Sequence, residues 1–201
     1  MLRFLVSSLS GLSFLVLAAC SEPTARSGQV TATGIAQIGG TYELVNQDGE
    51  TVTDQSFIGK PQLIYFGFSY CPDVCPLALQ KLGAVLSDVD PKGEYFQPIF
   101  MSVDPERDTP ESLKLYVTAR GFPKNLIGLT GTGEQVETAK TAYKIYSQKV
   151  EDPGSTAEYT IDHVSLVYLM GTDGKFVDVF TDSTTVPEMV KRLKLYKKRN
   201  R

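Results

Sequence analysis

The sequence predicts an α/β protein in which helices flank a central mixed sheet and a β-hairpin joins that sheet near the N-terminus. Two apolar, β-rich runs, at 62–68 and 96–103, have the character of buried strands. Each is followed by a segment with the apolar spacing of a helix, and this alternation favours a sheet that is parallel at its centre. Two pairs of strand-like segments flank turn sequences, at 42–53 and 164–180, and predict antiparallel hairpins.

The first predicted elements are the N-terminal hairpin and the first core strand. Segments 42–45 and 50–53 alternate apolar and polar residues around a turn that contains Asp48-Gly49. The core strand at 62–68 then leads into a helix predicted over 72–87, where leucines and valines recur at helical spacing. Its first residue is a proline, which suits a helix start because the missing N–H has no partner there.

The second core strand, at 96–103, also leads into a helix. Thr109 is expected to cap this helix with Pro110 at its first position, and the helix is expected to run to residue 120. Asp108 could support the cap.

The last third of the chain is expected to complete the sheet. A short strand at 126–129 precedes a helix at 134–146. The segment 150–160 fits no clear element and is expected to be a loop. The hairpin at 164–180 turns at its Asp-Gly sequence and finishes one edge of the sheet, and a helix at 186–198 closes the domain.

The first 40 residues predict an export signal and a tether. Residues 1–19 combine one arginine with a short apolar core and small residues, which define a secretory signal. Leu-Ala-Ala before Cys20 resembles the bacterial lipoprotein signal, so Cys20 is the expected lipidation site. The alternative is a single uncleaved N-terminal transmembrane anchor, for which the apolar stretch is short. Residues 20–40 are expected to be a flexible tether and 41–201 the domain.

Both readings place the domain beside a membrane, and the lipoprotein signal indicates the periplasmic side of a bacterial membrane. The formal net charge of −3 is uneven, because seven cations and no acid occupy the last eleven residues. We interpret this tail as a solvated helix end whose cations complement the helix dipole, with contact to anionic lipid as the alternative. An exported chain with an acidic body excludes nucleic acid as a partner.

The most informative motif is the cysteine pair Cys71 and Cys75, between the first core strand and its helix. Residues four apart share a helix face, so both sulfurs are expected to aim at one point near a helix N-terminus, which favours thiolates. An oxidising compartment would join them as a disulfide. A purely structural disulfide is disfavoured, because closing so short a loop contributes little stability. Metal binding and thiol exchange both remain, and a cysteine pair in this order of elements looks like a thioredoxin-type fold.

The chain has one histidine, His163, just before the apolar strand of the last hairpin. Two thiolates and one imidazole suit a soft metal such as copper. Zinc competes for such ligands, but its structural sites usually close with four, and Cys20 is expected to carry lipid. A single histidine can also be a surface or core residue. Asp162 could orient the second ring nitrogen or serve as a turn residue.

Three strings resemble the Sco/SenC family, copper proteins of cytochrome c oxidase assembly, over about residues 39–196. They are Cys71-Pro72-Asp73-Val74-Cys75-Pro76 after an aromatic strand, Val103-Asp104-Pro105-Glu106-Arg107-Asp108-Thr109-Pro110-Glu111, and Asp162-His163 followed by Tyr168-Leu169-Met170. Arg107 could pair with Asp104 or face a partner. Val164 and Gly171-Thr172 depart from the family's pattern without touching an expected ligand.

The resemblance implies a thioredoxin-like fold and a copper site, for Cu(I) and/or Cu(II), with Cys71, Cys75 and His163 as ligands. It implies a membrane-tethered metallochaperone that delivers copper to the dinuclear copper site of cytochrome c oxidase subunit II, or reduces the cysteines of that site. The expected partners are subunit II, a thioredoxin-like reductant, other periplasmic copper carriers, and the membrane through a lipid anchor.

The alternative function is a general extracytoplasmic thiol-disulfide oxidoreductase, in which Cys71 and Cys75 form the redox disulfide and His163 is not required. A peroxide-reducing enzyme on the same fold would normally place a threonine about four residues before its nucleophile, and 61–71 contains none. The preferred interpretation is therefore a carrier rather than an enzyme.

Overall fold

The computed structural model describes residues 37–151, 154 and 157–200. The expected signal at 1–19, the lipidation site Cys20 and most of the tether at 20–40 lie outside this part. The described residues belong to one compact unit. Within the described ranges, no helix has both the length and the apolar character needed to cross a membrane.

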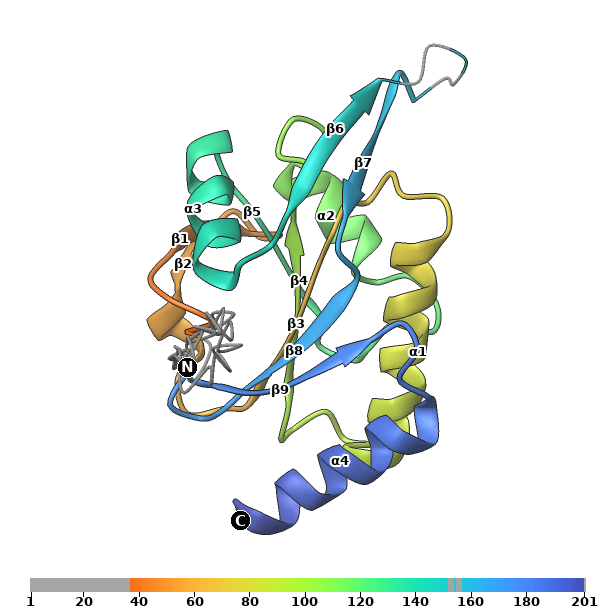
Figure 1. Ribbon diagram of the computed structural model, residues 1–201. Helices are drawn as coiled ribbons and strands as arrows, with labels where there is room; N and C mark the ends of the chain where they lie inside the picture. Colours follow the sequence, from red (N-terminus) through yellow and green to blue (C-terminus); the bar gives the residue numbers. More distant parts are fainter. Residues whose placement is uncertain (1–36, 152–153, 155–156, 201) are drawn as a thin grey trace, which may run out of the picture. The chain divides into compact units, whose positions relative to one another are not determined.

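Seven strands form the central sheet. They are β1 (Glu43–Asn46), β2 (Thr51–Thr53), β3 (Gln62–Gly67), β4 (Gln97–Ser102), β5 (Ile127–Thr130), β8 (Leu166–Met170) and β9 (Phe176–Thr181). Their spatial order is β2-β1-β5-β4-β3-β8-β9. The three central strands run parallel, and β1 on one side and β8 on the other run antiparallel to them. This is the predicted mixed sheet with the predicted hairpins at its two edges (Figure 1).

The first hairpin owes its turn to one asparagine. The Asn46 side-chain oxygen accepts hydrogen bonds from the N–H groups of Asp48 and Glu50, both at 2.9 Å. Gly49 has a φ of +81°, which glycine adopts without strain. The turn therefore fixes the register in which β2 pairs with β1.

The described residues contain five helical segments, four between strands and one after the last strand. They are the 3₁₀ helix η1 (Asp54–Phe57) and the α-helices α1 (Val74–Val89), α2 (Pro110–Tyr116), α3 (Gly133–Tyr143) and α4 (Val186–Arg199). Threonines 109, 132 and 185 cap α2, α3 and α4, each accepting a backbone N–H from the first turn. Helix α1 begins without such a side-chain cap, and this difference matters for the cysteines.

The two faces of the sheet carry different helices. Consecutive residues of a strand point to opposite faces. Tyr65 pairs with Phe100 on one face, where Phe100 also packs against Tyr116 of α2, at 5.1 Å between ring centroids. Phe66 points to the other face and packs against Tyr143 of α3, at 5.4 Å. Figure 1 shows α3 on the opposite side of the sheet from α1, and α4 packs along α1.

Two predicted helices end earlier than expected. Helix α2 ends at Tyr116 rather than at residue 120, and the chain continues through hydrogen-bonded turns to Gly121. Helix α3 ends at Tyr143 rather than at residue 146, because Lys144 takes a left-handed conformation with a φ of 58°. The backbone N–H of Ile145 then closes the helix end on the carbonyl of Lys140.

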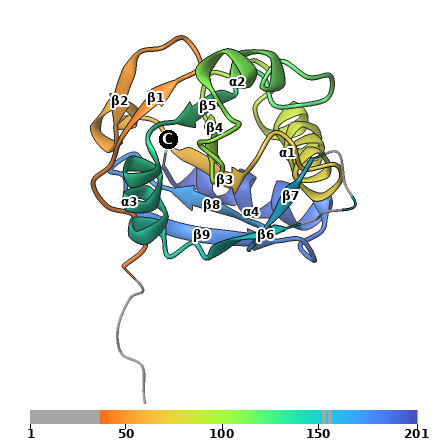
Figure 2. The same ribbon diagram turned by 90° about the horizontal axis from the view of Figure 1, so that it is seen from above.

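The loop expected at 150–160 is shorter than expected, because 150–151 and 159–160 belong to strands. Strand β6 (Ser147–Glu151) pairs antiparallel with β7 (Tyr159–His163) in a second, two-stranded sheet. Four of the five residues of β6 are exposed, so no apolar alternation marks it in the sequence. Figure 1 shows this hairpin extending beyond the central sheet, and Figure 2 shows β7 beside the N-terminal end of α1.

Candidate metal centre

The two cysteines lie at the junction between β3 and α1. Beyond Gly67 the chain turns back, and the N–H of Cys71 donates to the carbonyl of Phe68 at 3.2 Å. Helix α1 begins at Val74, two residues later than expected. Cys71 therefore precedes the helix and Cys75 lies in its first turn, so the expectation that both share a helix face was wrong. The tight turn, rather than helical spacing, brings them together.

The sulfur of Cys71 takes the place of the missing helix cap. The backbone N–H of Cys75 donates to Cys71 Sγ at 3.4 Å. The side chain of Asp73, the residue just before the helix, forms no capping hydrogen bond. Because the first N–H groups of a helix lack partners within it, a sulfur at this position satisfies one of them and gains from the positive end of the helix dipole.

The pKa values of the two thiols are shifted in opposite directions. The pKa of Cys71 falls from 9.0 to about 5, chiefly because the Cys75 thiol donates to its sulfur, with further hydrogen bonds from the backbone at Cys75 and Asp73. The same hydrogen bond, together with burial, raises the pKa of Cys75. Cys71 is therefore a thiolate at neutral pH while Cys75 keeps its proton, the arrangement of a nucleophilic or metal-binding sulfur backed by a reserve thiol.

Cys75 is enclosed by the core, with no exposed surface, whereas Cys71 keeps 7% of its surface exposed. Gly67 makes room for the inner sulfur. A Cβ at Gly67 would lie 2.9 Å from Cys75 Sγ and 2.9 Å from the Tyr65 ring. The last residue of β3 must therefore be small for Cys75 to occupy this position.

His163 reaches the cysteines from the end of β7. Its Nε2 lies 3.4 Å from Cys75 Sγ, although 88 residues separate the two in the chain. The other ring nitrogen, Nδ1, lies 3.1 Å from the carbonyl oxygen of Val164, which can only accept. Nδ1 therefore carries the proton and Nε2 faces the sulfur. The carbonyl of Val164, rather than the exposed Asp162, orients the ring.

Aromatic rings hold the imidazole in place. Tyr65 and Phe68 both meet His163 edge to face, with ring centroids 6.3 and 5.9 Å away. Edge-to-face contact restricts rotation of the ring without using either of its nitrogens. The structure thus brings Cys71 to Cys75 and Cys75 to His163. Among the described residues, no three cysteine, histidine or acidic side chains already converge as a complete metal cage.

Asp108 ties the cysteine loop to β4, a role that the sequence did not reveal. Its buried carboxylate accepts hydrogen bonds from the backbone N–H of Ser69, at 3.1 Å, and from the hydroxyls of Ser69 and Ser102. Burial raises the pKa of Asp108. The sequence suggested that Asp108 supports the Thr109 cap, but its carboxylate bonds to Ser69 and Ser102 instead. The string 103–111 was evident in the sequence, but only the fold shows that Asp108 faces Ser69.

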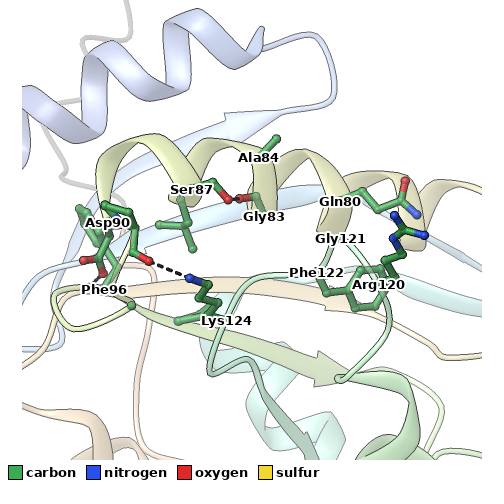
Figure 3. A pocket seen from close by; sticks show the side chains of 14 residues that line it. Gln80, Gly83, Ala84, Ser87, Asp90, Phe96, Arg120, Gly121, Phe122 and Lys124 are labelled. Carbon is green, nitrogen blue, oxygen red and sulfur yellow. Dashed lines mark hydrogen bonds between the residues drawn. The ribbon is translucent and has the colours of Figure 1, made fainter.

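A cavity of about 510 Å³ lies elsewhere, along the C-terminal half of α1 (Figure 3). In Figure 3 Gln80 and Arg120 lie at one end of it, and Lys124 extends to the carbonyl of Pro91, at 2.9 Å, at the other. Neither cysteine of the pair nor His163 lines it. The candidate site, which follows the C-terminal end of β3, is therefore separate from this cavity.

Fold and site together define a thioredoxin-like α/β protein in which a cysteine pair with three intervening residues faces a histidine. The sequence model of the SCO1/SenC family matches residues 30–198. The chain belongs to the SCO1/SenC family.

Individual relatives support this membership. The chain is 42% identical over 148 residues to the mitochondrial SCO1 homolog of Homo sapiens, covering 71% of this chain and 47% of the human protein. It is 43% identical over 160 residues to protein SenC of Rhodobacter capsulatus, covering 80% and 70% of the two chains. The chain thus spans about half the length of the human relative.

Solved structures agree with the fold. Arabidopsis thaliana ScoI with copper bound is 35% identical, with a TM-score of 0.75 over 81% of this chain and 99% of that one. Bradyrhizobium japonicum ScoI with copper bound is 43% identical, with a TM-score of 0.70 over 79% and 99%. The predicted thioredoxin-like fold is confirmed.

Proposed function

We propose that this protein is a copper carrier that holds one copper ion between Cys71, Cys75 and His163. The contact that carries the proposal is the 3.4 Å approach of His163 Nε2 to Cys75 Sγ, next to a sulfur whose pKa is lowered to about 5. Thiolate and imidazole are ligands that copper prefers. Two relatives of the same fold are described with copper bound, which supports the same cargo here.

The order in which the ligands bind copper follows from the pKa values of the two thiols. Cys71, already a thiolate and with 7% of its surface exposed against none for Cys75, is the sulfur that meets an incoming Cu(I) first. Cys75 then loses its proton to the solvent as its sulfur binds, because a cationic metal stabilises the second thiolate. His163 Nε2, 3.4 Å from Cys75 Sγ, supplies the third ligand.

Release of copper to an acceptor follows from the low coordination number of the bound ion. A three-coordinate Cu(I) site keeps a position open, so a thiolate of an acceptor can attack the metal before the donor sulfurs leave. The family resemblance supports the dinuclear copper site of cytochrome c oxidase subunit II as the acceptor. It also supports a thioredoxin-like reductant that keeps the pair reduced, and other periplasmic copper carriers as donors.

The predicted placement beside a membrane supports this acceptor. We propose lipidation at Cys20 and residence of the domain on the periplasmic side of a bacterial membrane, on the basis of the signal at 1–19. A single transmembrane anchor at the same segment is the alternative. Either would hold the carrier near a membrane-bound oxidase.

A second function, thiol-disulfide exchange, is favoured by one specific observation. A low-pKa thiolate beside a partner thiol of raised pKa resembles the nucleophilic and resolving pair of reductases. In that case the thiolate of Cys71 attacks a substrate disulfide and Cys75 resolves the mixed disulfide. The two electrons come from the dithiol, which ends as a disulfide.

One experiment separates the two functions. The purified full chain is titrated with Cu(I) against a competing chelator, and disulfide reduction is assayed in parallel for the wild type and for His163→Ala. A carrier loses Cu(I) affinity in the variant, whereas a reductase keeps its activity. Asp162→Asn is the matched control, because its exposed side chain neighbours His163 without orienting it. Unchanged Cu(I) affinity in His163→Ala together with strong reductase activity would refute the carrier.

A further inference from the structure

Arg107 lies between the two segments that carry the ligands. It belongs to the turn after β4, and its guanidinium sits over the ring of Tyr159, 3.6 Å from the centroid. On the cysteine side it lies 4.9 Å from the centroid of Tyr70, the residue before Cys71, and 5.7 Å from that of Phe68. One planar cation thus contacts both the loop that carries Cys71 and the strand that ends in His163.

Hydrogen bonds fix the same arginine to the start of β7. Nη1 of Arg107 donates to the carbonyl oxygens of Ala157 and Tyr159, at 3.0 and 3.1 Å. Nε donates to Asp104 at 2.5 Å, and Asp104 in turn accepts the Tyr159 hydroxyl at 2.9 Å. The side chain of Arg107 is only 14% exposed. Such a planar fork, with a stacking face and donors in fixed directions, is a geometry that lysine cannot reproduce.

These contacts lie at the opposite end of β7 from His163, so they affect the orientation of the strand that carries the histidine. At its C-terminal end β7 is two residues from β8, which is paired within the central sheet. At its N-terminal end, about 13 Å away along an extended strand, its contacts with the body of the protein include Tyr159 on Arg107 and Asp104. A hairpin held only at that C-terminal end would be free to rotate about it, which would change the direction in which the His163 ring faces Cys75.

We propose that Arg107 is a positioning residue that clasps the β6–β7 hairpin to the cysteine loop, so that His163 is preorganised for copper. This inference rests on the proposed function, because it concerns the third ligand of that site. Arg107 itself touches no metal. Preorganisation raises affinity by removing the entropy that binding would otherwise spend on ordering the ligand.

A plain charge effect is the competing explanation, since a cation near the site could act on the thiolate directly. Arg107→Met removes both the clasp and the charge. Arg107→Lys keeps the charge but offers one ammonium in place of the planar fork. Arg192→Met is the matched control, because Arg192 also stacks on a ring, Phe180 at 4.5 Å, and also pairs with an aspartate, Asp178, but on the β9–α4 side.

Two measurements on the full chain test the clasp. The first is amide hydrogen exchange without metal, where Arg107→Met is expected to lower protection at Tyr159–His163 and Arg192→Met to leave it unchanged. The second is Cu(I) affinity against a chelator. Arg107→Met is expected to weaken it about tenfold, the equivalent of re-ordering one or two side chains, with Arg107→Lys recovering only part. In a His163→Ala background Arg107→Met is expected to change affinity less than about twofold, because the coupled partner is gone.

The outcomes are distinct. Equal loss of affinity with and without His163, or full recovery with Arg107→Lys, overturns the clasp and leaves a charge effect. Unchanged protection of β7 in a folded Arg107→Met variant also overturns it, and thermal unfolding shows whether the variant is folded. If Arg107→Met does not fold, the same two readouts on Arg107→Lys decide. If the wild type binds no Cu(I), the proposed function fails, while hydrogen exchange still tests the clasp.

Discussion

Replacing Cys75 by alanine should return much of the proton affinity that Cys71 has lost. In the wild type the Cys75 thiol is the largest cause of the low pKa of Cys71, ahead of the backbone hydrogen bonds. Alanine removes that donor but keeps the backbone N–H, so the pKa of Cys71 should rise from about 5 toward, without reaching, its ordinary 9.0. The side chain is buried and small, so the fold should tolerate the change.

The expected change in thiolate population is large. At pH 7 a thiol of pKa near 5 is ionised by about 100 to 1, and one of pKa 9 is protonated by about 100 to 1. A rise of even two pKa units would bring Cys71 to about half ionised at pH 7, an effect of roughly 2.7 kcal/mol on the protonation equilibrium.

The assay measures the rate of Cys71 alkylation as a function of pH. Mass spectrometry of the peptide that contains Cys71 monitors the reaction, so that Cys20 does not contribute. In the wild type the rate should reach half its plateau near pH 5, and in Cys75→Ala at a clearly higher pH. Cys71→Ser should remove the signal. An unchanged midpoint in Cys75→Ala would refute the assignment of the low pKa to the hydrogen bond from the Cys75 thiol.

Three further predictions concern stability. Gly67→Ala should cost about 1–3 kcal/mol in denaturant unfolding, since its Cβ has no room, whereas Gly133→Ala, with open space around it, should not destabilise; equal effects would contradict the packing argument. The depressed pKa of Cys71 stabilises the reduced fold above pH 9, and this contribution should fall steadily toward pH 5 and be absent below it. The wild type should therefore lose its advantage over Cys71→Ser across that window, and a constant difference would argue against the linkage. Asp108→Ala should cost about 1–3 kcal/mol, because it leaves the buried hydroxyl of Ser102 and the half-buried donors of Ser69 without their partner, and a neutral effect would show that they find other partners.

The sequence predicted the sheet because its patterns are strong where burial is complete. All six residues of β3 are buried, and the run 62–68 is apolar for that reason. The Asp-Gly turns and the Pro110 helix start are local signals, so they were also readable. The order of elements then led to the correct fold class.

The hairpin β6–β7 could not be read in the same way. Only Tyr159 and Ile161 of its ten strand residues are buried, so hydrophobic alternation is nearly absent. Its position depends on tertiary contacts with Arg107 and Asp104, which propensity does not report. For the same reason the sequence left the roles of the string 103–111 open, although the residues themselves were evident.

The site was partly predictable. Cys71, Cys75 and His163 stood out by residue type and by family resemblance, but their mutual geometry depended on a turn and on a strand that sequence patterns did not define. The capping role of the Cys71 sulfur and the orienting carbonyl of Val164 are backbone features, which no residue type announces.

The most direct test of the account is X-ray absorption spectroscopy of copper in the purified, Cu(I)-loaded chain. We expect one copper per chain, with two sulfur ligands and one imidazole nitrogen, and loss of the imidazole signal in His163→Ala. A copper environment with no imidazole in the wild type, or one unchanged by His163→Ala, would contradict the claim that the cysteine loop and the β7 strand share a single ion.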